Sequence, residues 1–161
     1  MLSVGLFILL SNVTYGQFSI KKMISISKMD NETFEIYAMD MDYSFHQFYN
    51  HSDTTHLMVV KSNGISMLKE VNGAESYIRR INYKRYADGE YNGEDTYVNY
   101  QTAVVSELKQ IYNELKLLGF NLYHSANDSS YNKYYSRFGH TSDGERVVIK
   151  IEKNWLEIDY Y

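Results

Sequence analysis

Residues 102–124, TAVVSELKQIYNELKLLGFNLYH, have the pattern of an amphipathic helix that leads directly into a strand. Apolar side chains recur at intervals of four, three, four and three residues, which places them on one helical face: Val104, Leu108, Ile111, Leu115 and Leu118. Gly119 stands where helices commonly end in the left-handed conformation, and Phe120 follows at the position that folds back onto Leu115. The pattern predicts a helix beginning near Thr102 that needs a partner surface and leads into a strand.

The composition is that of a single ordinary globular domain. The 161 residues are 44% hydrophobic and 22% charged, which is sufficient to bury a core without cross-links. The absence of cysteine excludes disulfides and thiolate metal sites, and seventeen tyrosines favour a sheet. With a net charge of −4, nucleic acid is not an expected partner.

The first sixteen residues have the pattern of a signal peptide. An apolar run over 4–10 is followed by a polar stretch in which Thr14 and Gly16 are small enough for the cleavage positions, and Gln17 would begin the mature chain. The run is too short to cross a bilayer, so no membrane span is expected after cleavage. The pattern predicts a periplasmic or secreted protein with a mature domain of residues 17–161.

A second helix is predicted after Asp30 or Asn31, with a helical stripe of Phe34, Tyr37, Ala38 and Met41. Shifting the chain by 77 residues superposes this helix and its exit on the first one, with Asp42 in the place of Gly119. The same shift places Ile81-Asn82-Tyr83 over Ile158-Asp159-Tyr160. We therefore expect two repeats, at about 30–86 and 102–161.

Each repeat is predicted to contain a helix, a short exit strand and three antiparallel strands. The three strands are placed at about 56–61, 65–71 and 77–86, and at about 131–138, 146–153 and 155–161. Turn chemistry is supplied by Ser62-Asn63-Gly64, Asn72-Gly73 and Asp143-Gly144. The predicted fold class is α+β, a tandem duplication of a helix plus a four-stranded antiparallel unit with the helices packed on one face of the sheet.

Residues 87–101, ADGEYNGEDTYVNYQ, are predicted to be an acidic linker between the repeats. An alternative is weak calcium binding, because Asp88, Glu90 and Asn92 fall at the first positions of an EF-hand loop. Asn99 occupies the twelfth position, where that loop requires a bidentate carboxylate.

Strand alternation predicts where a binding site would lie. In the last strand Leu156, Ile158 and Tyr160 would face the helices, and the opposite, open face would carry Trp155, Glu157, Asp159 and Tyr161. The repeat shift assigns Arg80 and Asn82, together with Ile78, to the same open face. Arg146 and Lys150 join it if Val147 and Ile149 face the helices. This mixture of aromatic and charged residues is typical of protein interfaces, although it also suits an ordinary solvated sheet face.

No catalytic, cofactor or metal motif stands out. Phosphate loops, dinucleotide fingerprints and serine-hydrolase elbows are absent, and His46, His51 and His56 do not have metal-ligand spacing. We expect surface or packing roles for these histidines and no metal or cofactor.

The tyrosine-rich chain, with its F-E-x-Y helix at Phe34 to Tyr37 and its L-G-F exit at Leu118 to Phe120, resembles small exported Bacteroidota proteins of uncharacterised function. The plan of two tandem α+β units looks like the β-lactamase-inhibitor-protein fold, and this resemblance implies a protein partner held on a concave aromatic sheet. The leading hypothesis is an exported, non-enzymatic binding module with a partner in the cell envelope or outside the cell. An alternative is an envelope hydrolase or carbohydrate-acting protein that uses Glu157 and Asp159.

Overall fold

The computed structural model describes residues 18–55, 58–71, 73–104, 107–127, 131–137, 144–152 and 155–161. The predicted signal peptide, residues 1–16, and Gln17 lie outside the described residues. In chain order the helices and strands are α1 (Ile20–Ser27), α2 (Asn31–Met39), β1 (Ser44–Thr55), β2 (Met58–Val71), β3 (Ala74–Ala87), β4 (Glu90–Thr102), α3 (Leu108–Leu117), β5 (Asn121–Asn127), β6 (Tyr131–Arg137), β7 (Glu145–Glu152) and β8 (Trp155–Tyr160).

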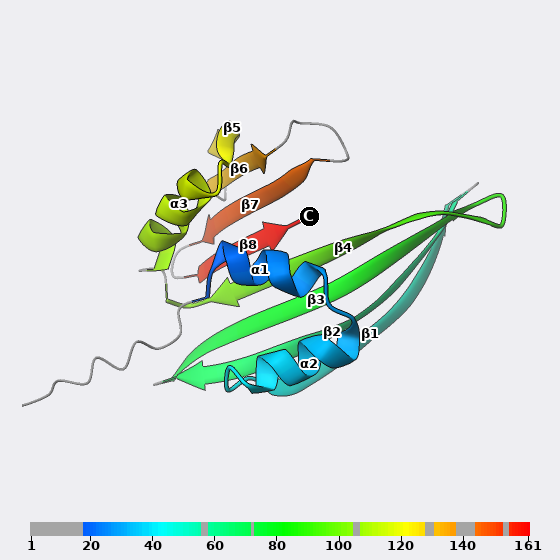
Figure 1. The fold of residues 1–161 in the computed structure, drawn as a ribbon, viewed down its shortest axis with the longest axis horizontal. Coiled ribbons are helices and arrows are strands. Elements are labelled where there is room, and N and C mark those ends of the chain that lie inside the picture. Colours follow the sequence, from blue (N-terminus) through cyan, green and yellow to red (C-terminus); the bar gives the residue numbers. More distant parts are fainter. Residues whose placement is uncertain are drawn as a thin grey trace, which may run out of the picture.

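The strands form one antiparallel sheet in the order β1-β2-β3-β4-β8-β7-β6-β5 (Figure 1). Its two halves, β1–β4 and β5–β8, are each a run of sequential hairpins, and they meet where β4 pairs with β8. The α+β class with an antiparallel sheet is confirmed.

One hydrophobic core holds the helices to the sheet. α1 contributes Ile20, Met23 and Ile26, each with no exposed surface, at the three-residue spacing of one helical face. The core also includes Phe34 of α2 and Leu115 of α3, together with strand residues from both halves of the sheet. Figure 1 shows α1 and α2 lying across the same side of the strands. One core therefore joins the two halves.

Both predicted helix ends have the expected backbone geometry. Gly119 has φ +82°, and the Phe120 N–H donates to the Leu115 carbonyl at 2.9 Å. Asp42 has φ +65°, and the Tyr43 N–H donates to the Ala38 carbonyl at 3.0 Å. The chain turns from each helix into the following strand through the same type of cap.

The helix predicted to begin near Thr102 in fact begins at Leu108. Thr102 still belongs to β4, where it pairs with Leu156, and its hydroxyl accepts the Val104 N–H at 3.0 Å. Val104 is 38% exposed, so it is not part of the apolar stripe. Pairing with β8 extends the strand into residues whose spacing alone also fits a helix.

The turn predicted at Ser62-Asn63-Gly64 is also wrong, because these residues lie in the middle of β2. Gly64 is required there for a steric reason: a Cβ atom would lie 2.2 Å from the Arg80 carbonyl oxygen of the adjacent strand. The glycine permits a close approach of two backbones within the sheet.

Residues 87–101 are not a linker. Asp88 and Gly89 have φ +51° and +82° and form a two-residue hairpin turn, after which 90–102 make up β4. β4 lies at the centre of the sheet, and Val98 is completely buried. The calcium-loop alternative is also wrong, because these residues form a hairpin turn and a strand instead of an EF-hand loop. The boundary predicted for the first unit, at residue 86, leaves out this fourth strand.

The two halves of the sheet differ in length. β1–β4 have 12 to 14 residues each, whereas β5–β8 have 6 to 8. Figure 1 shows the long hairpins projecting past α1 and α2 as an arm. We define the arm as the described residues 50–55, 58–61 and 84–94. The helices cover the base of these strands and leave the arm open.

Candidate binding face

The candidate site lies on the outer face of the sheet, defined as the side that carries Asp159 and is turned away from the core. Leu156 and Ile158 have no exposed surface and belong to the core, as the alternation in β8 predicts. Directly paired residues share a face, so Asn99 of β4, Arg79 of β3 and Val148 of β7 lie on the outer face with Asp159.

This register corrects the placement of Arg80, Asn82 and Ile78. Arg79 is the β3 residue in line with Asp159, so Arg80 and Asn82 lie on the opposite face. Ile78 is a fully buried core residue. The 77-residue shift aligned β3 with β8, although the fourth strand of the first half is β4. Because side chains alternate with a period of two, an error of one residue moves the whole set to the other face.

A buried polar network stands at the centre of the outer face. Asp159 has no exposed surface, and its carboxylate accepts from the Tyr97 hydroxyl and from Asn99 Nδ2, each at 2.6 Å. Lys150 Nζ lies 2.7 Å from the second carboxylate oxygen. Glu157 accepts from the same Asn99 Nδ2 at 2.8 Å and lies 3.6 Å from the same lysine. The two carboxylates therefore share one amide and one ammonium group.

Electrostatics favour this arrangement of charges. Burial opposes the charge on Lys150, but the hydrogen bond and charge of Asp159, followed by the charge of Glu157, outweigh burial and raise the lysine pKa. Burial also raises the pKa of Tyr97, and the adjacent Asp159 carboxylate adds to the effect. Tyr97 is therefore held in its neutral form, and its O–H group donates a hydrogen bond to Asp159.

Aromatic rings and cations surround the network. Tyr161 stacks obliquely on Tyr97 with ring centroids 5.2 Å apart, and Arg146 lies 5.6 Å from the Tyr161 ring. On the other side, Trp155 lies 6.3 Å from the Tyr77 ring. Tyr77 in turn meets His46 at 5.3 Å, and Arg79 lies 5.1 Å from the Tyr49 ring. These contacts form three groups of rings and cations spread over the outer face, which we call the band.

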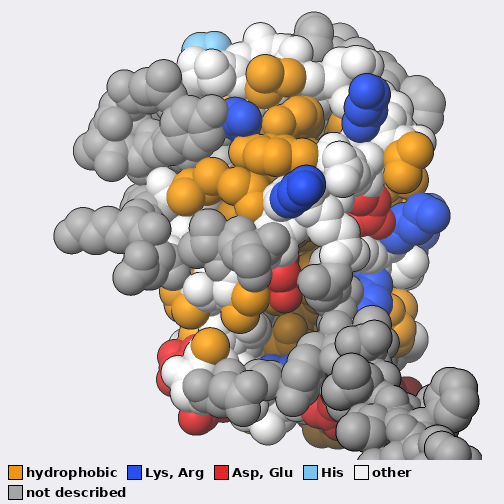
Figure 2. All heavy atoms as spheres, turned by 90° about the vertical axis from the view of Figure 1, so that its left-hand side faces the viewer, with side chains coloured by type: hydrophobic (Ala, Val, Ile, Leu, Met, Phe, Trp, Pro, Cys, Tyr) orange, Lys and Arg blue, Asp and Glu red, His pale blue; other side chains and the backbone are white. Residues whose placement is uncertain are grey.

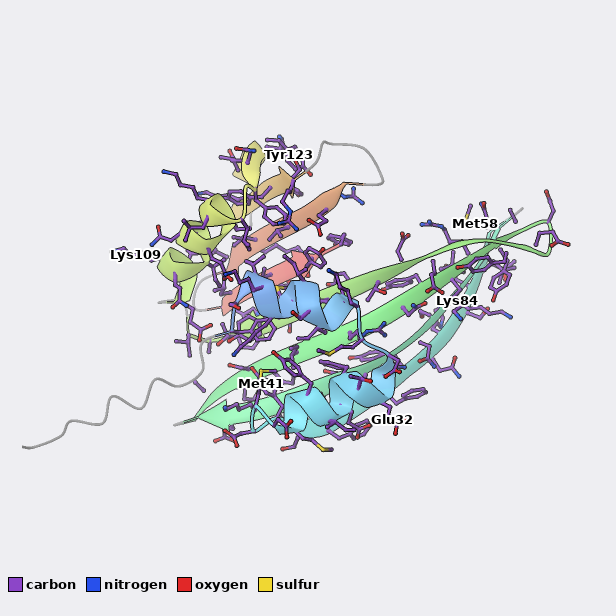
Figure 3. The ribbon with its side chains drawn as sticks, in the orientation of Figure 1. Glu32, Met41, Met58, Lys84, Lys109 and Tyr123 are labelled. Atoms are coloured by element: carbon purple, nitrogen blue, oxygen red, sulfur yellow. The ribbon has the colours of Figure 1, made fainter. Side chains whose placement is uncertain are left out.

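The band continues across the second half of the sheet. Tyr134 of β6 contacts both Tyr123 and His124 of β5, with ring centroids 6.2 and 5.2 Å apart. Figure 3 shows Tyr123 at the end of the sheet opposite the arm. A depression of about 410 Å³ lies beside the network, between Arg79, Tyr97 and Tyr161. The outer face thus combines rigid rings, both signs of charge and a shallow hollow.

Four of the six predicted site residues share this face: Trp155, Glu157, Asp159 and Tyr161. Arg80 and Asn82 do not. Sequence reasoning missed Tyr97, Asn99 and Gln101, which lie in the stretch assigned to a linker. The missed signal was the alternation of these three residues with Val98, Tyr100 and Thr102. The side chains of Val98, Tyr100 and Thr102 are buried on the opposite face.

Exposed apolar side chains also occur away from this face. Leu117 on α3 is 86% exposed and Leu122 on β5 is 52% exposed. Figure 2 shows hydrophobic side chains interspersed with lysine, arginine and acidic residues in its upper half, the part of the molecule where α3 lies in Figure 1. Leu117 and Leu122 are not part of the outer-face band.

Among the described residues, no three His, Asp or Glu side chains are grouped so that they could hold a metal ion. None of the described helices has the length and apolar character needed to span a bilayer. Comparisons with protein-family models, curated proteins and solved structures find no match to this chain.

Proposed function

We propose that the protein is an exported, non-enzymatic binding module and that the outer face of its sheet holds a protein partner. The observation that carries this proposal is the band of aromatic and cationic side chains around the buried Asp159 network. Trp155 and Tyr161 lie outside the core, and Tyr161 is 46% exposed. Aromatic residues and arginines of this kind supply much of the binding energy at protein interfaces.

The buried network supports this function by keeping the face rigid. Asp159 connects β8 to Tyr97 and Asn99 of β4 and to Lys150 of β7, so three strands share one polar centre. A partner that docks on a preorganised surface loses less conformational entropy than one that must order flexible side chains. The face therefore suits recognition of a folded protein.

The geometry favours binding over hydrolysis. A glycosidase needs one carboxyl group to reach the leaving oxygen and a second to act as base or nucleophile. Asp159 has no exposed surface, and both Asp159 and Glu157 are engaged by Asn99 and Lys150. No contact of these carboxylates favours the hydrolase alternative.

The element order supports two further parts of the proposal. Each half of the chain consists of a helix followed by four strands, α2-β1-β2-β3-β4 and α3-β5-β6-β7-β8, and the strand order is mirrored about the β4–β8 pair. We interpret these halves as a tandem duplication with the helices on one face of the sheet. The similarity to the β-lactamase-inhibitor-protein plan belongs to the same interpretation.

Export can be tested separately. The apolar run before Thr14 and Gly16 motivates the proposal that cleavage leaves Gln17 as the first residue. We expect N-terminal sequencing of the protein from a Gram-negative host to start at Gln17 in the periplasm or medium. A mature soluble protein that retains Met1 would contradict export.

Binding is tested with Trp155→Ala combined with Tyr161→Ala. We expect the double variant to lose the partner that the wild-type protein retains from envelope extracts, because interface aromatics often contribute more than about 2 kcal/mol each. Trp155 is the only tryptophan, so a titration with the captured partner should change its fluorescence. The control is Tyr91→Ala, since Tyr91 is 56% exposed at the arm and pairs with Tyr86. Equal retention by the double variant and the control would refute the outer face as the site.

A further inference from the structure

A second site lies on the opposite side of the sheet, at the base of the arm. A cavity of about 660 Å³ opens there between the α1–α2 connection and strands β2, β3 and β4. Its lining includes Lys28, Asn31, Arg80, Asn82, Lys84 and Glu94. Figure 3 shows Lys84 on the strands beyond the α1–α2 connection. The volume lies within the range of small-molecule sites.

Arg80 is the unusual residue of this cavity. It is only 6% exposed, and it donates from Nε to the Ile26 carbonyl at 3.3 Å and from Nη1 to Asn31 Oδ1 at 3.0 Å. Both acceptors are neutral. No carboxylate in the described parts of the chain lies within ion-pair distance of it. The charges of Asp30 and Glu94 act on Arg80 from beyond ion-pair distance. Buried charges in proteins are normally paired directly, so this guanidinium group lacks the contacting carboxylate that is usual for it.

The groups around Arg80 indicate what kind of ligand could pair with its guanidinium group. Asn82 Oδ1 is buried without a hydrogen-bond partner, and Asn31 Nδ2 donates to Asn63 Oδ1. Among the charged lining residues, Lys28, Arg80 and Lys84 face two carboxylates, Asp30 and Glu94, which leaves one net positive charge. A single negative charge on a ligand would balance this lining. A dianion would exceed this charge and leave one uncompensated negative charge beside Asp30 and Glu94.

We propose that this cavity binds a small monoanionic carboxylate that also carries hydroxyl groups. The carboxylate lies against Arg80, whose planar donors match two carboxylate oxygens. The hydroxyl groups exchange hydrogen bonds with Asn63 and Asn82, because side-chain amides both donate and accept. The site is on the core side of the sheet and does not depend on a partner at the outer face.

The charge requirement can be tested by calorimetric titration of the intact protein with three sugars that share one ring. D-glucose is neutral, D-glucuronate is a monoanion and glucose 6-phosphate is a dianion at pH 7.5. We expect glucuronate to bind about tenfold or more tightly than either of the others, the difference that one charge-assisted hydrogen bond supplies. Equal binding of glucose and glucuronate, tighter binding of the phosphate, or no binding of glucuronate would overturn the proposal.

Variants then locate the site. Arg80→Met should abolish the preference for glucuronate, and Lys84→Gln should weaken glucuronate binding about threefold or more by removing one charge at the rim. Lys109→Gln is the matched control, because Lys109 is an exposed lysine on α3, far from the cavity in Figure 3. If Arg80→Met does not fold, the comparison of Lys84→Gln with Lys109→Gln still tests where glucuronate binds. Equal affinities of those two variants would overturn the proposed location.

Discussion

At the residue scale, Asp159 is the centre of the polar network on the outer face. It lies directly beside Ile158, which belongs to the core, but its own side chain is buried on the other side of the sheet by Tyr97, Asn99 and Lys150. A polar group with no exposed surface is tolerated only when its hydrogen bonds are made. The carboxylate therefore has a structural role, and its hydrogen bond positions Tyr97, on which Tyr161 stacks.

Asp159→Ala should lower the free energy of unfolding by roughly 3 kcal/mol, because it leaves Tyr97, Asn99 and Lys150 without their shared acceptor. The exposed Asp53 of β1 provides the control, and Asp53→Ala should change the stability by less than about 0.5 kcal/mol. Urea denaturation of the two variants and the wild type measures both values. Equal midpoints for the two variants would mean that the network contributes nothing to stability.

At the scale of the helix, α3 offers a matched pair of leucines. Leu115 has no exposed surface and Leu117 is 86% exposed, although they lie two residues apart on the same helix. Leu115→Ala should cost roughly 2–5 kcal/mol, since it removes buried methyl groups and leaves a cavity, while Leu117→Ala should cost less than about 0.5 kcal/mol. Helix propensity is the same in both changes, so a urea melt isolates packing. Similar losses would show that α3 does not pack as described.

At the scale of the strand, Gly64 and Gly73 separate two reasons for glycine. A Cβ atom at Gly64 would lie 2.2 Å from the Arg80 carbonyl oxygen, whereas at Gly73, with φ +79°, a Cβ atom meets nothing within 4 Å. Gly64→Ala should therefore destabilise by more than about 2 kcal/mol through displacement of β2 from β3, and Gly73→Ala by about 1 kcal/mol through backbone conformation alone. Thermal melts of the two variants test this order. The reverse order would contradict the close approach.

The elements that sequence reasoning placed correctly are those determined by neighbouring residues. The caps at Asp42 and Gly119 depend on a few consecutive positions. Trp155, Glu157 and Asp159 share a face because they alternate within β8, and Tyr161 follows directly after this strand. Arg80 and Asn82 were misplaced because their face depends on the register between β3 and β4. That register is set by the Asp88-Gly89 turn together with a one-residue shift in the pairing between Lys84 and Tyr86, and the turn lay within the assigned linker.

At the scale of the whole molecule, the tyrosines link folding to pH. Burial is the main cause that raises the pKa of Tyr43, Tyr97, Tyr100 and Tyr160, four of the seventeen tyrosines. They lie in both halves of the sheet and in the chain that leaves α2. Ionisation of these phenols is therefore coupled to unfolding of the entire domain.

The sign of the pH dependence follows from proton binding. Below about pH 10 both the folded and the unfolded chain keep these phenolic protons, so stability does not depend on them. Above about pH 10 the unfolded chain releases the protons and the folded chain retains them, so each such tyrosine lowers the stability by up to about 1.4 kcal/mol per pH unit. Lys150 acts in the same direction, because its raised pKa gives a contribution that is complete below the unfolded value and is lost as pH rises through the folded value.

We therefore expect the urea midpoint to stay nearly constant from pH 8 to about pH 9.5 and to fall steeply by pH 11. Absorbance at 295 nm should show that some tyrosines of the folded protein ionise only as it unfolds. Tyr97→Phe tests the assignment: it lowers the stability at pH 8 by removing the hydrogen bond to Asp159, but it makes the decline above about pH 10 less steep by up to about 1.4 kcal/mol per pH unit. If the slope in the variant equals that of the wild type, Tyr97 does not contribute to the alkaline transition and is not buried against Asp159 in solution.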